Sequence, residues 1–506
     1  MEYIIVQAGG KGTRLGYLTK NKPKALVPVD NLPMLFYLFR KYPQKRFVII
    51  ADYKKDVMRE YLAAFADVKY QIVDASGTGT CSGVKQAIDL IPEHEAFMLV
   101  WSDLILPDKF ELPEEYSGDL DAKNDYVGLS ETFPCRWKYE GGQFAEERST
   151  EYGVAGFFLF TEKAKIENVP ESGELVRWLS EQGISFKTVG LGGTREFGLL
   201  EEYEKLSQAK CRPFNKITID GDYLIKEPID SQGEKLAVRE TAWYEKAKLL
   251  NIPELPRIYD TSPLKMERVL GKNIYECDFD YETKKSILKS LVGALKALHD
   301  SDKKAADSFS IQEAYFNKTF DRLAKIQDLV PFARDKEIIV NGKKCRNVFY
   351  HRRELQDKLD ELKVNCREFA FIHGDCTFSN LMVREDNSPV LIDPRGYFGF
   401  TELYGDVRYD WAKLYYSIVG NYDRFNLKQF RLEILENQDE GVKLQIDSNH
   451  WEDMEDDFFG FTGADKEEIK LLHAVIWLSL TTYAWQDYDS ICGAFYNGLY
   501  YLEEVL

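Results

Sequence analysis

The sequence predicts two domains, an α/β domain over residues 1–209 followed by an α+β domain over residues 210–506. Length is the first observation, because 506 residues exceed the roughly 250 to 300 that one hydrophobic core usually supports. The second is an apolar strand at residues 3–6 that runs directly into a glycine-rich turn. The third is a polar loop that lies between two apolar stretches. The first stretch is at residues 371–372, and the second leads directly to Asp393. Each half therefore contains its own predicted ligand site.

The composition argues against several classes of partner. The chain has 66 Lys and Arg against 84 Asp and Glu, a net charge of −18, whereas nucleic acids and anionic membranes select basic surfaces. Its 8 cysteines are scattered without a Cys-x-x-Cys pair, so neither a zinc site nor a disulfide framework is indicated. No stretch approaches about 18 uninterrupted apolar residues, and no charged leader precedes the first strand. We therefore expect a soluble cytoplasmic protein that acts on small molecules.

The first strand is followed by two stretches suited to phosphate binding. The glycine-rich turn comprises Gln7, Ala8, Gly9, Gly10, Lys11, Gly12, Thr13 and Arg14, and a basic stretch over residues 21–29 contains Lys24. Glycines let the backbone approach a nucleotide, and their amides can point at phosphate oxygens. Lys11 and Arg14 add positive charge where a triphosphate would lie. A glycine-rich turn alone is more often a plain strand-to-helix connection, but the two stretches together favour a nucleotide site.

The remainder of the first half predicts further strands with polar ends. Residues 56–66 predict a helix, 69–73 a strand, and 77–84 a second glycine-rich segment that includes Gly79. A strand at 96–101 ends at Ser102 and Asp103. Ligands of open α/β sheets gather at the carboxyl ends of strands, so Asp103 is either a metal ligand or a local cap. Residues 151–160 predict a buried strand whose glycines serve either close packing or a substrate pocket.

Over about residues 1 to 207 these motifs resemble the nucleotidyltransferases that activate sugar phosphates and phosphocholine. The resemblance implies a Rossmann-like domain with a mixed central sheet. It also implies nucleotide binding by Ala8, Gly9, Gly10, Gly12, Thr13 and Gly79, and catalysis by Lys11, Arg14 and Lys24, the last on the acceptor phosphate. A second metal carboxylate of this family lies in an Asp-apolar-Gly-x-x-Glu-x-Tyr pattern. Residues 196–203 match it with Glu196 in place of Asp, so Asp103 and Glu196 are the implied metal ligands.

The second half begins, after a join near residues 211–213, with an alternating stretch at 215–227. Its centre is an Asp-Gly pair, which predicts a β-hairpin that ends with Lys226 near the strand terminus. A helix predicted from Arg239 contains Glu240 and Glu245. No Gly-x-Gly-x-x-Gly loop precedes Lys226, so the hairpin itself would have to cover any bound phosphates.

The strongest motif of the chain lies at residues 371–396. His373-Gly374-Asp375 is followed at a fixed offset by Asn380, and a second apolar stretch ends in Asp393. These offsets put oxygen ligands around one point, which is the set needed to hold Mg²⁺ on ATP and to orient a hydroxyl toward the γ-phosphate. We predict that Asp375 accepts the hydroxyl proton and that Asn380 and Asp393 bind the metal. A polar turn between two strands would need all these matches to arise by chance.

At these residues the second half resembles the aminoglycoside phosphotransferase and choline kinase superfamily, whose fold is that of the two-lobed protein kinases. The likeness runs from near Phe214 to the end of the chain. It implies that Lys226 contacts ATP phosphates and pairs with a helix carboxylate, for which Glu240 fits better than Glu245. Both residues of this pair could instead be surface charges. Backbone groups near Glu267 and Val269 would meet the adenine.

Two further residues of this half are expected to be structural. His299 ends a helix predicted at 286–299, and Asp410 opens a later helix. We expect Asp410 to be an N-terminal cap or a loop anchor and His299 to have no part in catalysis.

Two features bear on the phosphate acceptor. Choline kinases usually continue after the second metal ligand with an aromatic residue and an acid, whereas this chain has Pro394, Arg395 and Gly396, which weakens choline as the substrate. Aromatic residues also gather near the end of the chain, namely Trp477, Tyr483, Trp485, Tyr488, Phe495, Tyr496, Tyr500 and Tyr501. They form either a cage for a quaternary ammonium or, as helical spacing more often indicates, a packed core.

The two likenesses together predict a bifunctional enzyme, because a kinase makes a phosphomonoester and a nucleotidyltransferase consumes one. With Mg²⁺ and ATP it would phosphorylate a small hydroxyl compound, an amino alcohol such as choline or a sugar. It would then transfer a nucleotidyl group, with CTP as the first candidate donor, giving an activated precursor for bacterial surface glycan. The alternatives keep one active half, either a kinase with a nucleotide-sensing first domain or a nucleotidyltransferase with a pseudokinase module.

Overall fold

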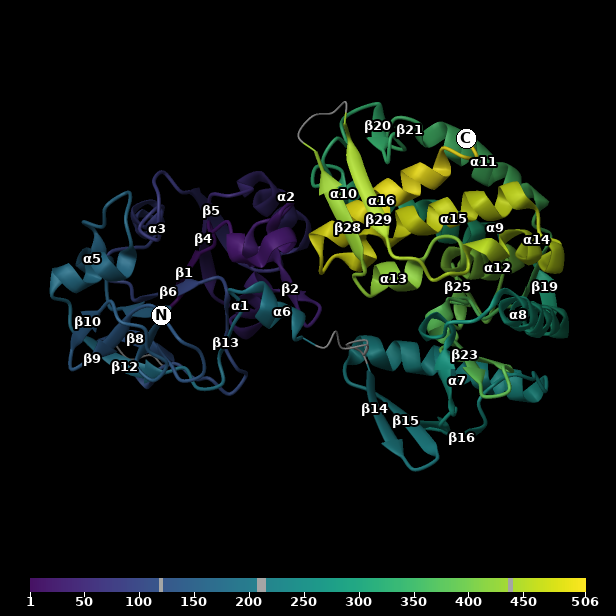
Figure 1. Ribbon diagram of the computed structural model, residues 1–506, viewed down its shortest axis with the longest axis horizontal. Coiled ribbons are helices and arrows are strands. Elements are labelled where there is room, and N and C mark those ends of the chain that lie inside the picture. The colour runs from purple at the N-terminus through teal and green to yellow at the C-terminus, as the bar shows by residue number, and fades with distance from the viewer. Residues whose placement is uncertain (118–121, 207–214, 436–439) are drawn as a thin grey trace. The chain divides into compact units, whose positions relative to one another are not determined.

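A computed structural model describes residues 1–117, 122–206, 215–435 and 440–506 (Figure 1). The chain divides into two compact units, residues 1–208 with 485–489 and residues 209–484 with 490–506. Each unit has its own hydrophobic core. The predicted domain boundary after residue 209 and the predicted join at 211–213 lie outside the described residues. Among the described residues, no helix has both the length and the apolar character that crossing a membrane requires.

The first unit is built on a nine-stranded sheet. Four central strands run parallel in the order β6 (Phe97–Trp101), β1 (Tyr3–Gln7), β4 (Arg46–Ala51) and β5 (Lys69–Asp74). The remaining strands are β8 (Asp125–Ser130), β9 (Lys138–Glu140), β10 (Gln143–Ala145), β11 (Gly153–Phe160) and β12 (Phe186–Gly190). Since β11 pairs antiparallel with β6, the sheet is mixed, and the predicted α/β Rossmann-like domain is confirmed.

Strands β1, β4 and β6 are nearly continuous apolar runs because both faces of the sheet are covered there, whereas β5 is only partly buried. Ile5, Leu99 and Phe158 are fully buried in one core on these strands. The helices of this unit are α1 (Met34–Lys41), α2 (Lys55–Phe65), α3 (Val84–Asp89), α4 (Glu114–Ser117), α5 (Leu175–Gln182) and α6 (Leu200–Glu204). Short strand pairs are β2 (Pro28–Val29) with β3 (Leu32–Pro33) and β7 (Leu104–Ile105) with β13 (Arg195–Glu196).

One glycine of β11 has a clear packing role. Gly156 has a φ of +77°, at a shift in register between Val154 and Phe158. A Cβ atom at Gly156 would lie 2.0 Å from the indole of Trp101. Close packing therefore requires glycine here, in agreement with the packing interpretation of the stretch at 151–160.

The second unit begins with a four-stranded antiparallel sheet. Its order is β14 (Asn215–Asp220), β15 (Tyr223–Pro228), β17 (Leu264–Glu267) and β16 (Ile258–Thr261). The predicted hairpin is present, and Gly221 supplies its left-handed residue with a φ of +57°. Helix α7 (Ser231–Leu249) starts earlier than the predicted Arg239, because the Asp230 side chain caps it by accepting from the Gly233 amide.

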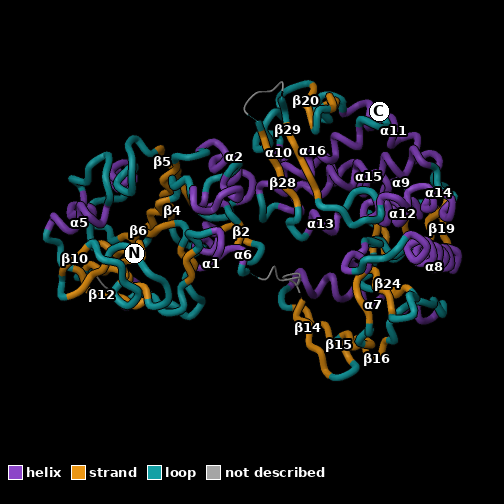
Figure 2. Tube along the Cα trace, viewed as in Figure 1, coloured by secondary structure: helices purple, strands orange, loops and turns teal. Residues whose placement is uncertain are grey.

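The rest of this unit is mainly helical, as the purple elements of Figure 2 show. Its main helices are α8 (Tyr281–Ser301), α9 (Ser308–Ile311), α10 (Lys318–Ile326), α11 (Arg352–Asn365), α12 (Val407–Ile418), α13 (Tyr422–Asn426), α14 (Glu455–Thr462), α15 (Lys466–Leu480) and α16 (Tyr488–Leu502). Helix α8 contains the predicted 286–299 helix and buries Leu291 and Leu295. The α+β, two-lobed kinase-like class predicted for this half is thereby confirmed.

Small sheets connect the helices of the second unit. One consists of β18 (Gly271–Asn273), β23 (Leu381–Arg384) and β24 (Pro389–Leu391), and another of β19 (Lys303–Ala305), β22 (Glu368–Phe371) and β27 (Tyr404–Gly405). A four-stranded sheet has the order β21 (Lys343–Arg346), β20 (Glu337–Val340), β29 (Val442–Ile446) and β28 (Phe430–Ile434), and β25 (Tyr397–Phe398) pairs with β26 (Thr401–Glu402).

Three of the late aromatic residues belong to the core of this unit. Trp477, Phe495 and Tyr496 are fully buried. The Trp477 indole nitrogen donates to His473 Nε2 at 3.0 Å, and the Tyr496 hydroxyl donates to the Pro331 carbonyl at 2.8 Å. These side chains follow the packing interpretation and form no cage for a ligand.

Candidate active sites

The first site forms at the carboxyl end of β6. Asp103 follows this strand, and β13 pairs with β7 so that Glu196 lies opposite Leu104, the residue after Asp103. The Lys24 ammonium forms an ion pair with Asp103 and lies 3.9 Å from Glu196 Oε1. The fold thus gathers three residues that are scattered in the sequence.

The charges of this site suit a divalent cation. Burial and the Asp103 carboxylate raise the pKa of Glu196, although Lys24 and Arg14 act in the opposite direction. Asp103 Oδ1 is buried and has no hydrogen-bond partner among the described residues. A buried carboxylate oxygen without a donor is unfavourable unless a cation occupies the place of the donor. Asp103 and Glu196 therefore fit Mg²⁺, which binds hard oxygen ligands, typically one or two carboxylates together with phosphate oxygens.

The glycine-rich turn follows β1 on the same edge of the sheet. The Ala8 amide donates to the Ile50 carbonyl, and the Gly9 carbonyl accepts from Tyr53, so the first part of the turn is anchored. Gly12 has a φ of +66°, and a Cβ atom there would lie 3.0 Å from Lys24 Cβ. The glycine therefore allows the turn to approach Lys24.

Four residues of the turn are exposed and available to a ligand, namely Gly10, Lys11, Thr13 and Arg14. The Lys11 ammonium lies 5.3 Å from the centre of the Tyr53 ring. Arg14 acts electrostatically on Glu196, so the turn can supply amides and positive charge to a triphosphate near the carboxylate pair.

The second glycine-rich segment lies at the end of β1. Gln7 Nε2 donates to the carbonyls of Thr80, at 2.8 Å, and Ser82, at 3.1 Å. Gly79 has a φ of +80° and packs against the backbone of Gly173. The sequence reasoning gave Gln7 no role of its own. Its position as a polar residue at a strand end was the available signal.

The second site is the loop between β22 and β23. Asn380 Nδ2 donates to Asp375 Oδ2 at 3.0 Å and to the Asp375 carbonyl at 2.9 Å. The Ile392 amide donates to the Asn380 carbonyl at 3.0 Å, which holds the strand end carrying Asp393 beside the loop. The three predicted oxygen-bearing side chains thus lie on adjoining backbone. Two carboxylates and an amide are hard oxygen donors of the kind that Mg²⁺ prefers.

Lys226 connects the first lobe to this loop. Its ammonium lies 2.8 Å from Glu240 Oε2 and 2.8 Å from Asp393 Oδ1. The predicted contact with Glu240 is therefore present, although β15 continues two residues beyond Lys226. Burial raises the pKa of Glu240 to about 7, against the opposing effect of Lys226.

Part of the predicted adenine-binding stretch already forms hydrogen bonds within the fold. The Glu267 carboxylate accepts from Arg384 at 2.6 Å and from the Arg257 amide at 3.0 Å, and the Glu267 amide donates to the Arg257 carbonyl. By contrast, the Val269 backbone has no hydrogen-bond partner within the described ranges. Val269 is thus the better placed of the two predicted residues for contact with a base.

Sequence reasoning missed one residue of the catalytic loop's surroundings. Lys413, on α12, places its ammonium 2.9 Å from Asp375 Oδ1. Asp410, one turn earlier, accepts from the amides of His373 and Gly374 at 2.9 and 2.7 Å. The spacing of three residues between Asp410 and Lys413 puts both on one helix face and was the available signal.

The roles predicted for Asp410 and His299 can now be separated. His299 Nε2 lies 2.9 Å from Asp410, and the cap of α12 is Asp406, which accepts from the Arg408 amide. Asp410 is therefore a loop anchor and not the helix cap, and His299 supports it.

Comparison with known proteins assigns each half to a family. Residues 3–120 match the nucleotidyl transferase family, and residues 219–437 match the phosphotransferase enzyme family. The chain is a fusion of these two families. We refer below to the nucleotidyl transferase domain and the phosphotransferase domain.

Relatives of the nucleotidyl transferase domain act on sugar phosphates according to their names. D-glycero-alpha-D-manno-heptose 1-phosphate guanylyltransferase of Campylobacter jejuni is 29% identical over 100 residues, 19% of this chain and 45% of its own. Glucose-1-phosphate cytidylyltransferase of Salmonella typhimurium is 27% identical over 126 residues, 20% of this chain and 49% of its own. The chain thus spans about half the length of these curated relatives.

Two solved structures are similar to part of the chain. HddC from Yersinia pseudotuberculosis is 22% identical with a TM-score of 0.34, over 41% of this chain and 98% of that chain. CTP:phosphocholine cytidylyltransferase from Streptococcus pneumoniae is 19% identical with a TM-score of 0.30, over 41% of this chain and 97% of that chain.

Proposed function

We propose that this chain is a bifunctional enzyme that first phosphorylates a hydroxyl of a small compound with ATP. It then transfers a nucleotidyl group, with CTP as the first candidate donor, to the phosphate just formed. One observation carries the proposal. Each domain gathers its own constellation of carboxylates and lysine, with Asp103, Glu196 and Lys24 in one, and Asp375, Asn380, Asp393 and Lys226 in the other.

In the phosphotransferase domain, Asp375 has the position of the general base. Its carboxylate is held by Asn380 and lies beside Lys413, whose positive charge favours the ionised form that accepts a proton. The Lys226 ammonium contacts the carboxylates of Glu240 and Asp393, and it would contact the phosphates of ATP instead when the nucleotide binds. Asn380 and Asp393 would hold Mg²⁺, which supplies positive charge against the charge on the transferring phosphoryl group.

In the nucleotidyl transferase domain, the acceptor phosphate attacks the α-phosphorus of the triphosphate and pyrophosphate leaves. Lys11 and Arg14, both exposed on the turn, would bind the phosphates of the donor. Lys24 lies between the turn and the carboxylates and would bind the acceptor phosphate. Asp103 and Glu196 would hold Mg²⁺ against the charge that develops on the pyrophosphate.

The two reactions form a sequence because the product of the first has the chemical class that the second consumes. The names of the relatives support this order, since both curated relatives described above take a phosphomonoester of a sugar as acceptor. A nucleotide-activated precursor for bacterial surface glycan is the product class that we propose.

The test is a mass-spectrometric assay of the purified chain with Mg²⁺, ATP, the other nucleoside triphosphates and a pool of small alcohols and sugars. We expect one compound to gain a phosphate and then a nucleotide. With the free compound as substrate, Asp393→Ala should form neither product. With the phosphomonoester supplied, the same variant should still transfer the nucleotide. Addition of phosphate without any nucleotide transfer, even to the supplied phosphomonoester, would show that only the kinase half is catalytic.

A further inference from the structure

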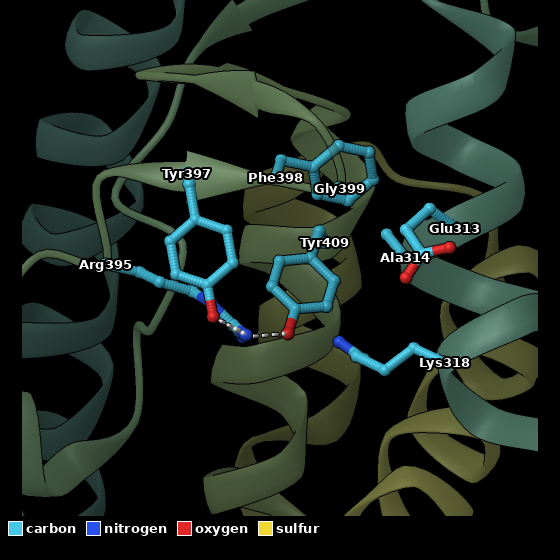
Figure 3. A pocket seen from close by; sticks show the side chains of 8 residues that line it. All are labelled: Glu313, Ala314, Lys318, Arg395, Tyr397, Phe398, Gly399 and Tyr409. Carbon is cyan, nitrogen blue, oxygen red and sulfur yellow. Dashed lines mark hydrogen bonds between the residues drawn. The ribbon is translucent and has the colours of Figure 1, made fainter. Parts of the chain in front are cut away.

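A cluster of positive charge lies beside the catalytic loop of the phosphotransferase domain. It surrounds a cavity of about 350 Å³, open mouth included, lined by Glu313, Ala314, Lys318, Arg395, Tyr397, Phe398, Gly399 and Tyr409. Figure 3 shows Arg395 reaching between the two tyrosines and the Lys318 ammonium pointing toward the Tyr409 hydroxyl. Arg322, one turn after Lys318 on α10, interacts electrostatically with both Lys318 and Arg395. We call Lys318, Arg322 and Arg395 the cation cluster.

The cluster has little negative charge to balance it. Arg395 donates to the hydroxyls of Tyr409 at 2.8 Å and Tyr397 at 2.7 Å, which are neutral groups. Arg322 donates to the carbonyl and the hydroxyl of Ser479. Among the described residues the Lys318 ammonium forms no hydrogen bond or ion pair, although the Glu313 carboxylate interacts with it electrostatically. Among the residues that line the cavity, Lys318 and Arg395 are cationic and Glu313 is the one carboxylate, so positive charge is in excess there.

The surroundings respond to this excess of positive charge. Burial and the guanidinium groups of Arg395 and Arg322 lower the pKa of Lys318 well below its ordinary value. Burial raises the pKa of the Tyr397 phenol, but Arg395 and Arg239 outweigh it and the pKa is lowered. Glu313 partly offsets the positive charge at Lys318, and Asp375 that at Arg395. The three cations still outnumber these two carboxylates, which in a chain with a net charge of −18 indicates a place for an anion supplied from outside.

The cluster adjoins the residue that would accept the hydroxyl proton. The Arg395 amide donates to the His373 carbonyl at 2.8 Å, and a Cβ atom at Gly374 would lie 2.9 Å from Arg395 Cβ. Asp375 interacts electrostatically with Arg395, and Lys413, its ion-pair partner, interacts with Lys318. A small compound could therefore place its hydroxyl at Asp375 and another group in the cavity.

We propose that the phosphate acceptor is an acidic hydroxyl compound whose carboxylate or phosphate group binds in this cavity, held by Lys318 and Arg395 with Arg322 behind them. This inference rests on the proposed kinase function and specifies its substrate class. A guanidinium and an ammonium are the usual partners of both oxyanions. A cationic acceptor such as choline would instead meet like charge in this cavity.

The experiment uses the full chain with Mg²⁺ and ATP and acceptors that share a scaffold but differ in charge. One series is glycerol, D-glycerate and glycerol 3-phosphate, another is glucose, D-glucuronate and glucose 6-phosphate, and choline is the cationic member. Initial rates give kcat/KM, and thermal shift in the presence of a non-hydrolysable ATP analogue gives binding without turnover. The variants are Lys318→Met, Lys318→Arg and, as the matched control, Lys325→Met at an exposed lysine of the same helix.

We expect at least one acidic compound to exceed its neutral parent at least tenfold in kcat/KM, mainly through KM. Lys318→Met should remove this preference and the thermal shift by the acid, whereas Lys318→Arg and Lys325→Met should keep both. Preference for the carboxylate or the phosphate member identifies the anion. The proposal would be overturned if wild type and Lys318→Met both used neutral or cationic acceptors as well as acidic ones, as judged by kcat/KM. If acids bind through Lys318 but receive no phosphate, the anion site stands and the kinase function fails.

Discussion

Two lysines of the phosphotransferase domain lie in opposite electrostatic surroundings. Lys226 contacts two carboxylates, Glu240 and Asp393, each at 2.8 Å. Lys318 contacts none among the described residues and lies close to two guanidinium groups. Burial lowers the pKa of both ammonium groups, but Asp393 and Glu240 raise that of Lys226 above its ordinary value, while nothing comparable offsets the decrease at Lys318.

The difference in charge around the two lysines fits the different ligands that we propose for them. Lys226 is balanced in the free protein, so a nucleotide phosphate must compete with carboxylates that also suit Mg²⁺. Lys318 forms no ion pair among the described residues and the Glu313 carboxylate offsets its surroundings only in part, so an acidic ligand would supply a closer counter-charge. Under the proposed roles, the position of charge within the domain, and not the net charge of the chain, would separate a nucleotide-binding lysine from one that selects the acceptor.

The largest expected effect comes from Asp375→Asn. This change removes the predicted general base and leaves Lys413 without its ion-pair partner, so it also extends the unbalanced cluster. We expect the rate of phosphate transfer to fall by about 10²- to 10⁴-fold, the range typical of general bases, with acceptor binding retained or strengthened. Single-turnover kinetics and thermal shift measure the two effects, with Asp386→Asn, at an exposed loop, as the control. A variant that transfers phosphate at the wild-type rate would remove Asp375 from the mechanism.

Lys226→Met should have the next largest effect, this time on stability. The Glu240 side chain, in a residue with 7% exposure, would lose its cationic partner. Breaking a buried ion pair costs about 3 to 5 kcal/mol. The thermal transition of this domain is identified as the one that Mg²⁺ and ATP shift in the wild type. At pH 8 we expect the melting temperature of this transition to be lower in the variant by about 6 °C or more. Lys235→Met, at an exposed position of α7, should leave this transition unchanged. An unchanged transition in Lys226→Met would show that the pair contributes nothing to the folded lobe.

The pH dependence of the same pair gives a third, smaller effect. Because the pKa of Glu240 is raised from an unfolded value of 4.5 to about 7, its protonated form favours the folded state. This contribution is fully present below about pH 4.5 and is lost as the pH rises through about 7. Glu240→Gln cannot titrate, so the melting temperature of the variant relative to wild type should rise between pH 5 and pH 8. A difference that stays constant over this range would mean that Glu240 has an ordinary pKa.

The site around Lys226 could be predicted from the sequence far better than the surroundings of Lys318. Asp375 and Asn380 lie in one loop and Asp393 follows the β23–β24 hairpin directly after it, so fixed offsets were enough to group them. The contact between Lys226 and Glu240 followed from the order of strand and helix in the kinase-like arrangement. In the first domain, the match to a known pattern placed Glu196 near Asp103, which pairing of β13 with β7 explains.

The cation cluster could not be read from the sequence for a physical reason. Lys318 and Arg322 lie on α10, far from Arg395 in the chain, and only tertiary packing brings them together. A π-helical turn, Gln312–Asn317, directly precedes Lys318 and changes the residues per turn, so the ordinary helical period does not predict which side chains share a face. Arg395 alone carried a signal, as a departure from the choline kinase pattern.

The smallest expected effect, and the sharpest test of the contrast, is the stability of Lys318→Met. Removing a partly buried ammonium that has no ion-pair partner should raise the melting temperature slightly. A gain of about 1 kcal/mol in the free energy of unfolding corresponds to about 2 to 4 °C. Lys226→Met, by contrast, should lower the melting temperature. The sign with pH is also opposite, because the folded-state pKa of Lys318 lies below its unfolded value. The unfolded chain then binds more protons, so wild type should become more stable relative to Lys318→Met as the pH rises toward 10. Thermal unfolding of both proteins at pH 7 and pH 9.5 measures this difference, and a Lys318→Met variant that melts well below wild type at pH 7 would show that the ammonium has a counter-charge in the folded protein.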